Sequence, residues 1–486
     1  MTKKRFAFIA YAAVTIIAIL CLFPKYSYND PDTFWHIELG QYMIEHGSVL
    51  HHAIHTFYGD QLPYVPHEIG FQIVIATIYK IFGWTGAYAL TAISLFLLVL
   101  GLYRMACVSR KEMGMEQRHS ALFLLVLAVT ACVYYYYFAM RPQMMSAFLI
   151  VWFFVYLREF RMAPKTGYSV LLVLLSLAVA NIHTGVWLVV AVFTGMAVIE
   201  AWLEKKIDKR RALTFALVLL SGLANVGGLK SIFFIFVVTR NNFNMRIDEW
   251  QPIGFAQWVN FPRMLLLLAF VSILPFVLHR KPFRFMLMLG IVYLGVSNYK
   301  QNLFMWLFLP YFAATIVDII PHSDKLRTQW STRAISVCLA IGLSVNLAIA
   351  AFFPPPVDRK AYPVEEMNYI LQQQSDTGRP RVLAPYGASG YVMFRGGDIL
   401  CDGRQDPFIT SESKGVFGWT AFERSMNGFS EYLPEIVAYD RPDYVVTRNN
   451  SSYKHFDDWV SRFGDPVFKG EYGNVFLTKG MTNSKP

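Results

Sequence analysis

The sequence predicts an α-helical polytopic membrane protein, with about 11 transmembrane helices, two interfacial helices in the first outer loop and a C-terminal α/β soluble domain. Three observations predict this class. Hydrophobic residues make up 55% of the 486 residues, and charged residues only 16%, against about 25% in soluble domains. Several uncharged runs reach the ~20 residues that a helix needs to cross a bilayer. After residue 353 the composition changes to that of a soluble domain.

Taken in chain order, the apolar runs give eleven predicted spans. The run from Tyr168 to Leu203 is too long for one span, and Asn181–Gly185 in its middle predicts a turn between two. The run Ala212–Thr239 holds one span, broken near Gly227, followed by a short apolar helix. The predicted spans are Phe6–Phe23, Trp84–Tyr103, Ser120–Met140, Pro142–Leu157, the two halves of Tyr168–Leu203, Ala212–Thr239, Met264–Leu278, Phe285–Ser297, Gln301–Val317 and Ala334–Phe353.

The distribution of basic residues predicts the orientation. With the N-terminus inside, the inner segments carry 21 Lys and Arg residues and the outer side of the membrane region carries eight. Cytoplasmic loops are enriched in Lys and Arg, so this bias predicts a multi-pass protein of the cytoplasmic membrane with a cytoplasmic N-terminus. An odd number of spans then places the C-terminal domain outside. The net charge of +11 is thereby explained as a topology signal, and no nucleic-acid partner is expected.

Two helices are predicted within the first outer loop, residues 24–83 of a transmembrane domain that covers residues 1–353. In the first, Thr33–His46, a narrow polar stripe with Glu38 faces away from a broad apolar surface, and Gly47 ends the helix. The second, His67–Phe82, is apolar but short. Both are expected to lie in the membrane interface. His36 falls on the apolar side of the first helix, away from its glutamates.

Residues 354–486 are predicted to form an extracytoplasmic α/β domain. The pattern indicates helices at Val364–Gln373 and near Asp457–Phe463. Strands are expected at 381–384, 391–394, 440–447 and 474–478. In the loop that follows the second strand, Arg404 and Asp406 are candidates to contact a polar acceptor.

The first outer loop also carries the densest group of ionisable residues. Asp30 and Asp32 lie just past the first span and before an interfacial helix, a placement that suits a general base acting on a substrate at the membrane surface. The structural alternative is equally open. Asp32 is well placed as the N-cap of the following helix, and Asp30-Pro31 is compatible with an ordinary turn.

The segment Asp30-Pro-Asp-Thr-Phe-Trp-His-Ile37, with Gly40 and His46-Gly47, resembles the first outer loop of bacterial membrane proteins in the C-type glycosyltransferase (GT-C) superfamily. The resemblance continues in order along nearly the whole chain. It includes His67-Glu68, Arg141-Pro-Gln143, Asn181-Ile-His183, Glu249-Trp-Gln-Pro252, Gly390-Tyr391 and Asp402-Gly-Arg404.

The resemblance implies an inverting sugar transfer from a polyprenyl-phosphate donor to a glycan, lipid or protein acceptor of the cell envelope, at the outer face of the membrane. Asp30 or Asp32 would accept the proton of the acceptor hydroxyl. The resemblance leaves a divalent metal open, because related enzymes differ in whether a metal joins the carboxylates. Where a second acidic residue is expected, this sequence has His51-His-Ala-Ile-His55, whose spacing is compatible with a metal site but is more typical of a solvated loop.

The departing lipid phosphate needs cationic contacts, and few cations are predicted outside. Arg141 and Lys300 are the candidates, because charge-assisted contacts stabilise a developing anion. Arg141 is the first choice, because its guanidinium is the better phosphate fork. Both are also compatible with helix-end residues that extend to lipid headgroups, an alternative that fits Lys300 better. His183 is a further phosphate candidate or an interhelical hydrogen-bonding residue. The residues expected to bind substrate are His36, His67, Glu68, Arg141, His183, Glu249 and Lys300.

Two other functions remain open from the sequence. A transporter or flippase of a lipid-linked saccharide would have a similar number of spans, although such sites usually place ionisable residues at mid-membrane, and the predicted spans contain almost none. A non-catalytic GT-C-like partner in envelope polysaccharide assembly would keep the fold without the base.

Overall fold

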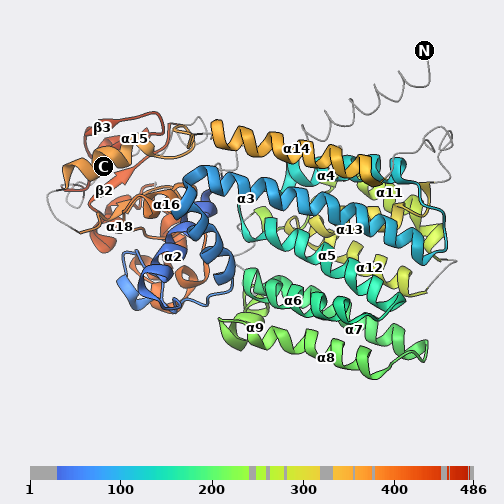
Figure 1. Ribbon diagram of the computed structural model, residues 1–486. Helices are drawn as coiled ribbons and strands as arrows, with labels where there is room; N and C mark the ends of the chain where they lie inside the picture. The colour runs from blue at the N-terminus through green and yellow to red at the C-terminus, as the bar shows by residue number, and fades with distance from the viewer. Residues whose placement is uncertain are drawn as a thin grey trace, which may run out of the picture. The chain divides into compact units, whose positions relative to one another are not determined.

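The computed structural model describes two compact units, formed from alternating parts of the chain (Figure 1). Unit 1 comprises residues 1–25 and 84–354, and unit 2 comprises residues 26–83 and 355–486. The first predicted span, Phe6–Phe23, lies outside the described residues. The described residues are 30–239, 248–258, 263–278, 282–317, 332–353, 356–374, 378–428, 430–449, 457–458, 460–479 and 481.

In the described residues of unit 1, all regular secondary structure is helical. Its first helix is the part of α3 (Ile69–Glu112) that follows an interruption at Gly83 (φ 58°, ψ −148°), where the chain passes from unit 2 to unit 1. The other helices are α4 (His119–Tyr137), α5 (Pro142–Met162), α6 (Thr166–Ile182), α7 (Thr184–Leu203), α8 (Lys209–Ser221), α9 (Gly228–Thr239), α10 (Phe255–Trp258), α11 (Arg263–Leu278), α12 (Pro282–Ser297), α13 (Leu303–Ala313) and α14 (Thr332–Phe352), with the 3-10 turns η3 (Gly222–Ala224), η5 (Asp248–Trp250) and η6 (Lys300–Asn302).

Three helices of the described chain are long and apolar enough to cross a membrane: α3, α5 and α7. A fourth candidate is the pair formed by residues 209–224 and 228–234, which bends by 100° at the break. Shorter apolar helices cover most of the other predicted spans, among them α6 and parts of α4, α11, α12 and α14. The membrane-type helical class is thus confirmed, and the predicted turn at His183 and break near Gly227 are found. The number of eleven stays a prediction.

Buried ion pairs join the helices of unit 1 at one end. The Arg158 guanidinium on α5 lies 2.6 Å from Glu112 at the end of α3 and 2.7 Å from Glu200 on α7. The Tyr311 hydroxyl on α13 donates to Glu112 at 2.6 Å. Charged groups this deeply buried need such partners, because an unpaired buried charge is strongly destabilising. Four helices are therefore held together at the end where the sequence predicts the inner face.

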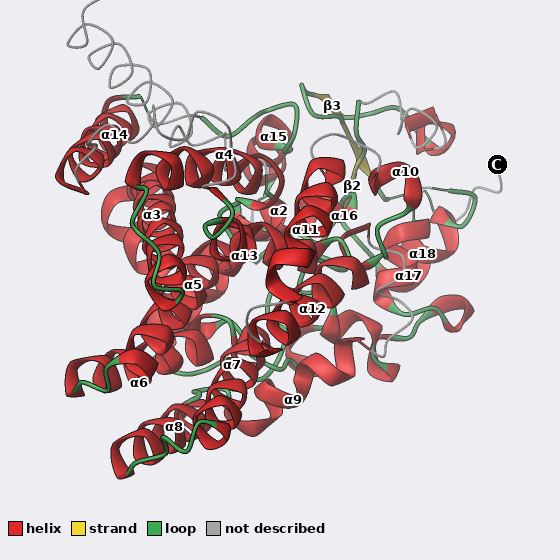
Figure 2. Cartoon of the chain, turned by 90° about the vertical axis from the view of Figure 1, so that its right-hand side faces the viewer, coloured by secondary structure: helices red, strands yellow, loops and turns green. Residues whose placement is uncertain are grey.

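Unit 2 combines helices with a small sheet, which contains every strand found in the described residues (Figure 2). The sheet has the order β1-β2-β4-β3, with β1 and β2 parallel and the other neighbours antiparallel. Its elements are α2 (Pro31–His46), the first part of α3, α15 (Val364–Gln373), α16 (Tyr386–Phe394), α17 (Ala421–Asn427), α18 (Leu433–Asp440), β1 (Val382–Leu383), β2 (Tyr444–Val446), β3 (Phe468–Lys469), β4 (Asn474–Leu477) and the 3-10 turns η2 (Gly59–Gln61), η9 (Asp406–Ile409), η10 (Ser411–Ser413), η11 (Val416–Gly418) and η12 (Ser461–Phe463).

The first outer loop and the C-terminal segment are joined by backbone hydrogen bonds within unit 2. The Phe57 amide donates to the Ile399 carbonyl at 2.9 Å, and the Ile399 amide donates to the His55 carbonyl at 3.1 Å. Unit 2 thus combines helices and strands, and it includes the first outer loop as well as the C-terminal segment. A separate C-terminal α/β domain stays a prediction.

Two local predictions in unit 2 are wrong. Residues 391–394, predicted as a strand, form the end of α16. The small residues before them let this helix approach α2, since a Cβ atom added to Gly390 would lie 2.5 Å from the Pro31 carbonyl oxygen. Asp440 ends helix α18, and the strand predicted from that residue begins only at Tyr444.

Candidate functional site

The two candidate carboxylates lie at the start of α2. Asp30 is the N-cap: its Oδ1 accepts a hydrogen bond from the Asp32 amide at 3.0 Å, and Pro31 occupies the first helical position. The alternative in which Asp32 caps the helix is therefore wrong. The Asp32 Oδ1 instead accepts from the Trp35 indole Nε1 at 2.9 Å. Asp30 is 9% exposed, and Asp32 is more exposed.

Glycines allow neighbouring segments to pack closely against α2. A Cβ atom on Gly403 would lie 2.1 Å from the Asp32 Oδ1 and 2.8 Å from the Trp35 Nε1. A Cβ atom on Gly40 would lie 2.1 Å from the Gln72 carbonyl oxygen of α3. Real Cβ atoms do not approach other atoms this closely, so only glycine fits. Gly403 is thus explained by packing against Asp32, and Gly40 by the contact between α2 and α3.

A second acidic group, the Glu68 carboxylate, lies next to α2. His36 is 1% exposed, and its Nε2 lies 3.8 Å from the Glu68 carboxylate. The Nε2 of His67 lies 3.9 Å from the same carboxylate, and its Nδ1 is 2.8 Å from the Val65 carbonyl. His36, predicted on the apolar side of α2, is buried and lies close to a glutamate of the following segment. The structure thus brings His36, His67 and Glu68 together.

Glu38 contacts a residue that sequence reasoning missed. Arg379 donates to the Glu38 Oε1 at 3.1 Å across 341 residues of sequence. Burial raises the pKa of Glu38, although Arg379 partly offsets this. Burial, together with the nearby Arg379, lowers the pKa of His55 to about 3. His55 is therefore neutral near pH 7, and its 3.5 Å contact with Glu38 is not an ion pair.

The histidines at positions 51, 52 and 55 do not form a metal site. Over the residues that the structure describes, no three His, Cys, Asp or Glu side chains gather as metal ligands. His51 and His52 are exposed, whereas His55 faces Glu38. The donor set of these three histidines thus does not fit a bound metal ion.

Asp402 and Arg404 form an internal ion pair. The Arg404 Nε lies 2.9 Å from the Asp402 Oδ1, and neither side chain is exposed. The guanidinium also donates to the Ile54 carbonyl at 3.1 Å. Arg404, considered above as an acceptor contact, instead fixes the 402–404 turn next to α2.

Asp406 is a buried carboxyl group with an elevated pKa. Its Oδ2 accepts from the Val65 amide at 3.3 Å, and its buried Oδ1 has no hydrogen-bond partner within the described chain. Burial raises the pKa to about 7, and the nearby His67 limits the rise. The neutral acid is therefore favoured in the folded protein well above the usual pKa of an aspartate.

Replacing Asp406 by asparagine should flatten the pH dependence of stability. The pKa of Asp406 is higher in the folded protein than in the unfolded chain. This difference stabilises the folded wild-type protein below about pH 4, and the stabilisation is lost as the pH rises towards 7. The free energy of unfolding changes by up to about 1.4 kcal/mol per pH unit over this range. Thermal unfolding between pH 4 and pH 8 measures it, with the exposed Glu431→Gln as control. An unchanged slope in Asp406→Asn would show that another group titrates.

Three of the predicted substrate-binding residues meet in unit 1. Arg141 occupies the N-cap position of α5, and its Nη1 donates to the Glu249 Oε1 at 2.8 Å. The Lys300 ammonium lies 3.9 Å from the other oxygen of the same carboxylate and 5.1 Å from the centre of the Trp250 ring. Two cations thus converge on one acid, and the Arg141–Glu249–Lys300 cluster carries a formal charge of +1.

His183 lies between α6 and α7, where the sequence predicts a turn. Its Nδ1 is 3.1 Å from the Ser146 hydroxyl on α5. This contact is an interhelical hydrogen bond, which is the alternative to phosphate binding that the sequence leaves open for His183. The phosphate-binding role of His183 therefore has less support than that of Arg141.

No protein-family model matches the chain, and no curated protein matches its sequence. Solved structures do match. ArnT from Cupriavidus metallidurans bound to undecaprenyl phosphate is 14% identical, with a TM-score of 0.54 over 98% of both chains. The archaeal oligosaccharyltransferase AglB from Archaeoglobus fulgidus, in complex with an inhibitory peptide and a dolichol-phosphate, is 12% identical, with a TM-score of 0.53 over 93% of this chain and 71% of AglB.

The apo form of ArnT is also similar, with a TM-score of 0.55 over the full length of both chains at 14% identity. At such identities it is the fold that is shared. The predicted resemblance to GT-C membrane enzymes is therefore confirmed for the fold.

Proposed function

We propose that the protein is a membrane glycosyltransferase that transfers a sugar from a polyprenyl-phosphate donor to an envelope acceptor at the outer face of the membrane. The fold supports this proposal, because two proteins that share it were solved with undecaprenyl phosphate and a dolichol-phosphate. The observation that carries it is the convergence of Arg141 and Lys300 on Glu249. The sequence predicts both cations as contacts of the lipid phosphate.

In the proposed reaction, Asp32 accepts the proton of the acceptor hydroxyl. The hydroxyl oxygen then bonds to the anomeric carbon from the face opposite the phosphate. The bond between that carbon and the phosphate oxygen breaks, and the polyprenyl phosphate leaves with the electron pair. One such displacement inverts the anomeric configuration.

Asp32 is the preferred base because Asp30 already serves as the helix cap. The Trp35 indole fixes the orientation of the Asp32 carboxylate, which is the usual requirement for a general base. Arg141 and Lys300 would stabilise the negative charge that develops on the leaving phosphate. Glu249 would hold the two cations at one place. His36, His67 and Glu68 would bind the sugar or the acceptor through polar contacts.

Transfer assays on the full-length protein in liposomes test this function. Labelled polyprenyl-phosphate sugars are supplied with envelope acceptors, and we expect a labelled product together with free polyprenyl phosphate. Arg141→Gln should lower the rate about a hundredfold, by analogy with the loss of one donor to a developing anion. Arg141→Lys keeps the charge but loses the planar fork, so an intermediate rate is expected.

Lys230→Gln, which removes an exposed cation also predicted outside, is the matched control and should leave the rate unchanged. Movement of intact lipid-linked sugar across the bilayer, without cleavage of the sugar-phosphate bond, would instead identify a flippase. Transfer that is equally sensitive to Lys230→Gln and Arg141→Gln would remove the cluster from the proposed site.

A further inference from the structure

Helices α6 and α8 of unit 1 lie side by side in a regular register. The Thr214 hydroxyl donates to the Ser169 hydroxyl at 3.0 Å, and the Ser221 hydroxyl donates to that of Ser176 at 2.7 Å. Both pairs join residues 45 positions apart. A constant offset means that the two helices run in the same direction, with two turns between successive contacts.

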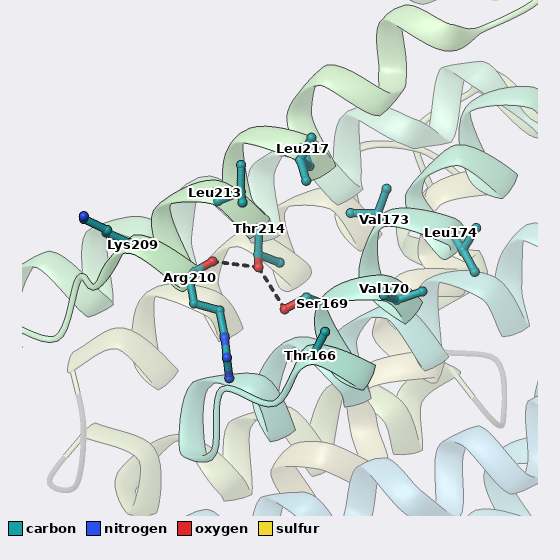
Figure 3. A pocket seen from close by; sticks show the side chains of 10 residues that line it. All are labelled: Thr166, Ser169, Val170, Val173, Leu174, Lys209, Arg210, Leu213, Thr214 and Leu217. Atoms are coloured by element: carbon teal, nitrogen blue, oxygen red, sulfur yellow. Dashed lines mark hydrogen bonds between the residues drawn. The ribbon is translucent and has the colours of Figure 1, made fainter.

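A groove of about 450 Å³ lies between these helices (Figure 3). Aliphatic side chains from both helices line most of it. Val170 and Leu174 on α6 are 51% and 55% exposed, and Leu213 on α8 is 61% exposed. So much exposed aliphatic surface is typical of helices that face lipid chains. The groove is therefore suited to a hydrocarbon chain.

Two cations lie where α8 begins and line the same groove: Lys209 and Arg210. Neither is ion-paired within the described chain. The nearby acids are already engaged, since Asp208 pairs with Arg211 at 2.6 Å and Glu204 pairs with Lys206 at 3.0 Å. The Arg210 guanidinium donates to the Pro164 carbonyl at 2.7 Å, which fixes one side of it. One end of the apolar groove is thus positively charged.

We propose that this groove binds an anionic glycerophospholipid. The phosphate of the headgroup contacts Lys209 and Arg210, and one acyl chain lies along Val170, Leu174 and Leu213. The charge selects an anionic lipid, because each Lys or Arg near a membrane surface contributes about 1 kcal/mol to the attraction of anionic lipids. The sequence predicts this end of α8 on the inner side, so the lipid belongs to the inner leaflet. The inference is independent of the proposed catalysis.

Native mass spectrometry of the full-length protein tests the proposal. The purified protein is titrated with phosphatidylglycerol or phosphatidylcholine of the same acyl chains. Wild type should bind phosphatidylglycerol at least about fivefold more tightly, and Lys209→Gln should remove about that factor. Leu213→Trp fills the groove and should weaken the binding of both lipids.

Two control variants match these substitutions outside the groove. Lys205→Gln removes an exposed lysine of the same loop, and Val192→Trp enlarges an exposed valine of α7; both should bind as wild type does. Equal affinity of wild type for the two lipids would overturn the proposal, as would equal losses in the control variants. Displacement of phosphatidylglycerol by millimolar inorganic phosphate would show an ion site instead of a lipid site.

Discussion

Asp32→Asn is expected to lower the rate of sugar transfer by between about 10² and 10⁴, the usual contribution of a general base. Asparagine keeps the shape of the side chain and its amide oxygen still accepts the hydrogen bond of the Trp35 indole. Only the ability to take a proton is removed. The loss should therefore appear in kcat, whereas KM should change little.

Asp30→Asn separates catalysis from helix capping. Asparagine caps helices as well as aspartate does, so this variant should fold as wild type and keep most of the transfer activity. Glu45→Gln, an exposed acid of the same helix, serves as a further control. A large loss in Asp30→Asn with normal activity in Asp32→Asn would reassign the base to Asp30. Wild-type rates in both variants would exclude both aspartates as the base.

Arg424→Met is expected to destabilise unit 2 by about 3–5 kcal/mol, the cost of leaving a buried charge without its partner. The Arg424 side chain is fully buried and binds both oxygens of Asp440, at 2.7 and 3.0 Å. It also donates to the Tyr58 hydroxyl of the first outer loop. Burial raises the pKa of Asp440 despite this pairing, so an unpaired Asp440 would take up a proton and limit the loss.

Thermal unfolding followed by tryptophan fluorescence measures this effect, with an expected decrease in Tm of about 10 °C. Arg359→Met breaks an exposed pair with Glu365 and should cost no more than about 1 kcal/mol. The double variant Arg424→Met/Asp440→Leu should recover most of the loss, because an apolar pair can replace a buried ion pair. A single variant as stable as wild type would contradict this account of the core.

The bounds of some helices could be predicted from local sequence patterns. Helix α15 was predicted with its observed bounds, and Gly47 ends α2 in the left-handed conformation (φ 62°), as its position predicts. Periodicity failed at residues 391–394, where apolar residues in sequence are compatible with either strand or helix. There the tertiary contact of Gly390 with α2, which no local pattern reveals, favours the helix.

The candidate site was predictable as a set of residues but not as an arrangement. The sequence predicts a substrate-binding role for each of Arg141, Glu249 and Lys300 but not the contacts between them. Their convergence appears only in the fold. The contact between Arg379 and Glu38 joins positions 341 residues apart, and no charge pattern within a helix or loop indicates such a pair. The same holds for Tyr58 and Arg424. Long-range pairing depends on how the units fold, and this information is distributed over the whole chain.

Unit 2 is assembled from two stretches of chain separated by the whole of residues 84–354. During synthesis the N-terminal stretch emerges first, carrying Asp30 and Asp32, but its packing partners around Gly390 and Gly403 are made last. The carboxylates therefore acquire their final surroundings only after every intervening helix has been synthesised. An incomplete chain would lack the segments that pack against α2, so the order of the sequence delays the completion of unit 2 until synthesis of residues 355–486.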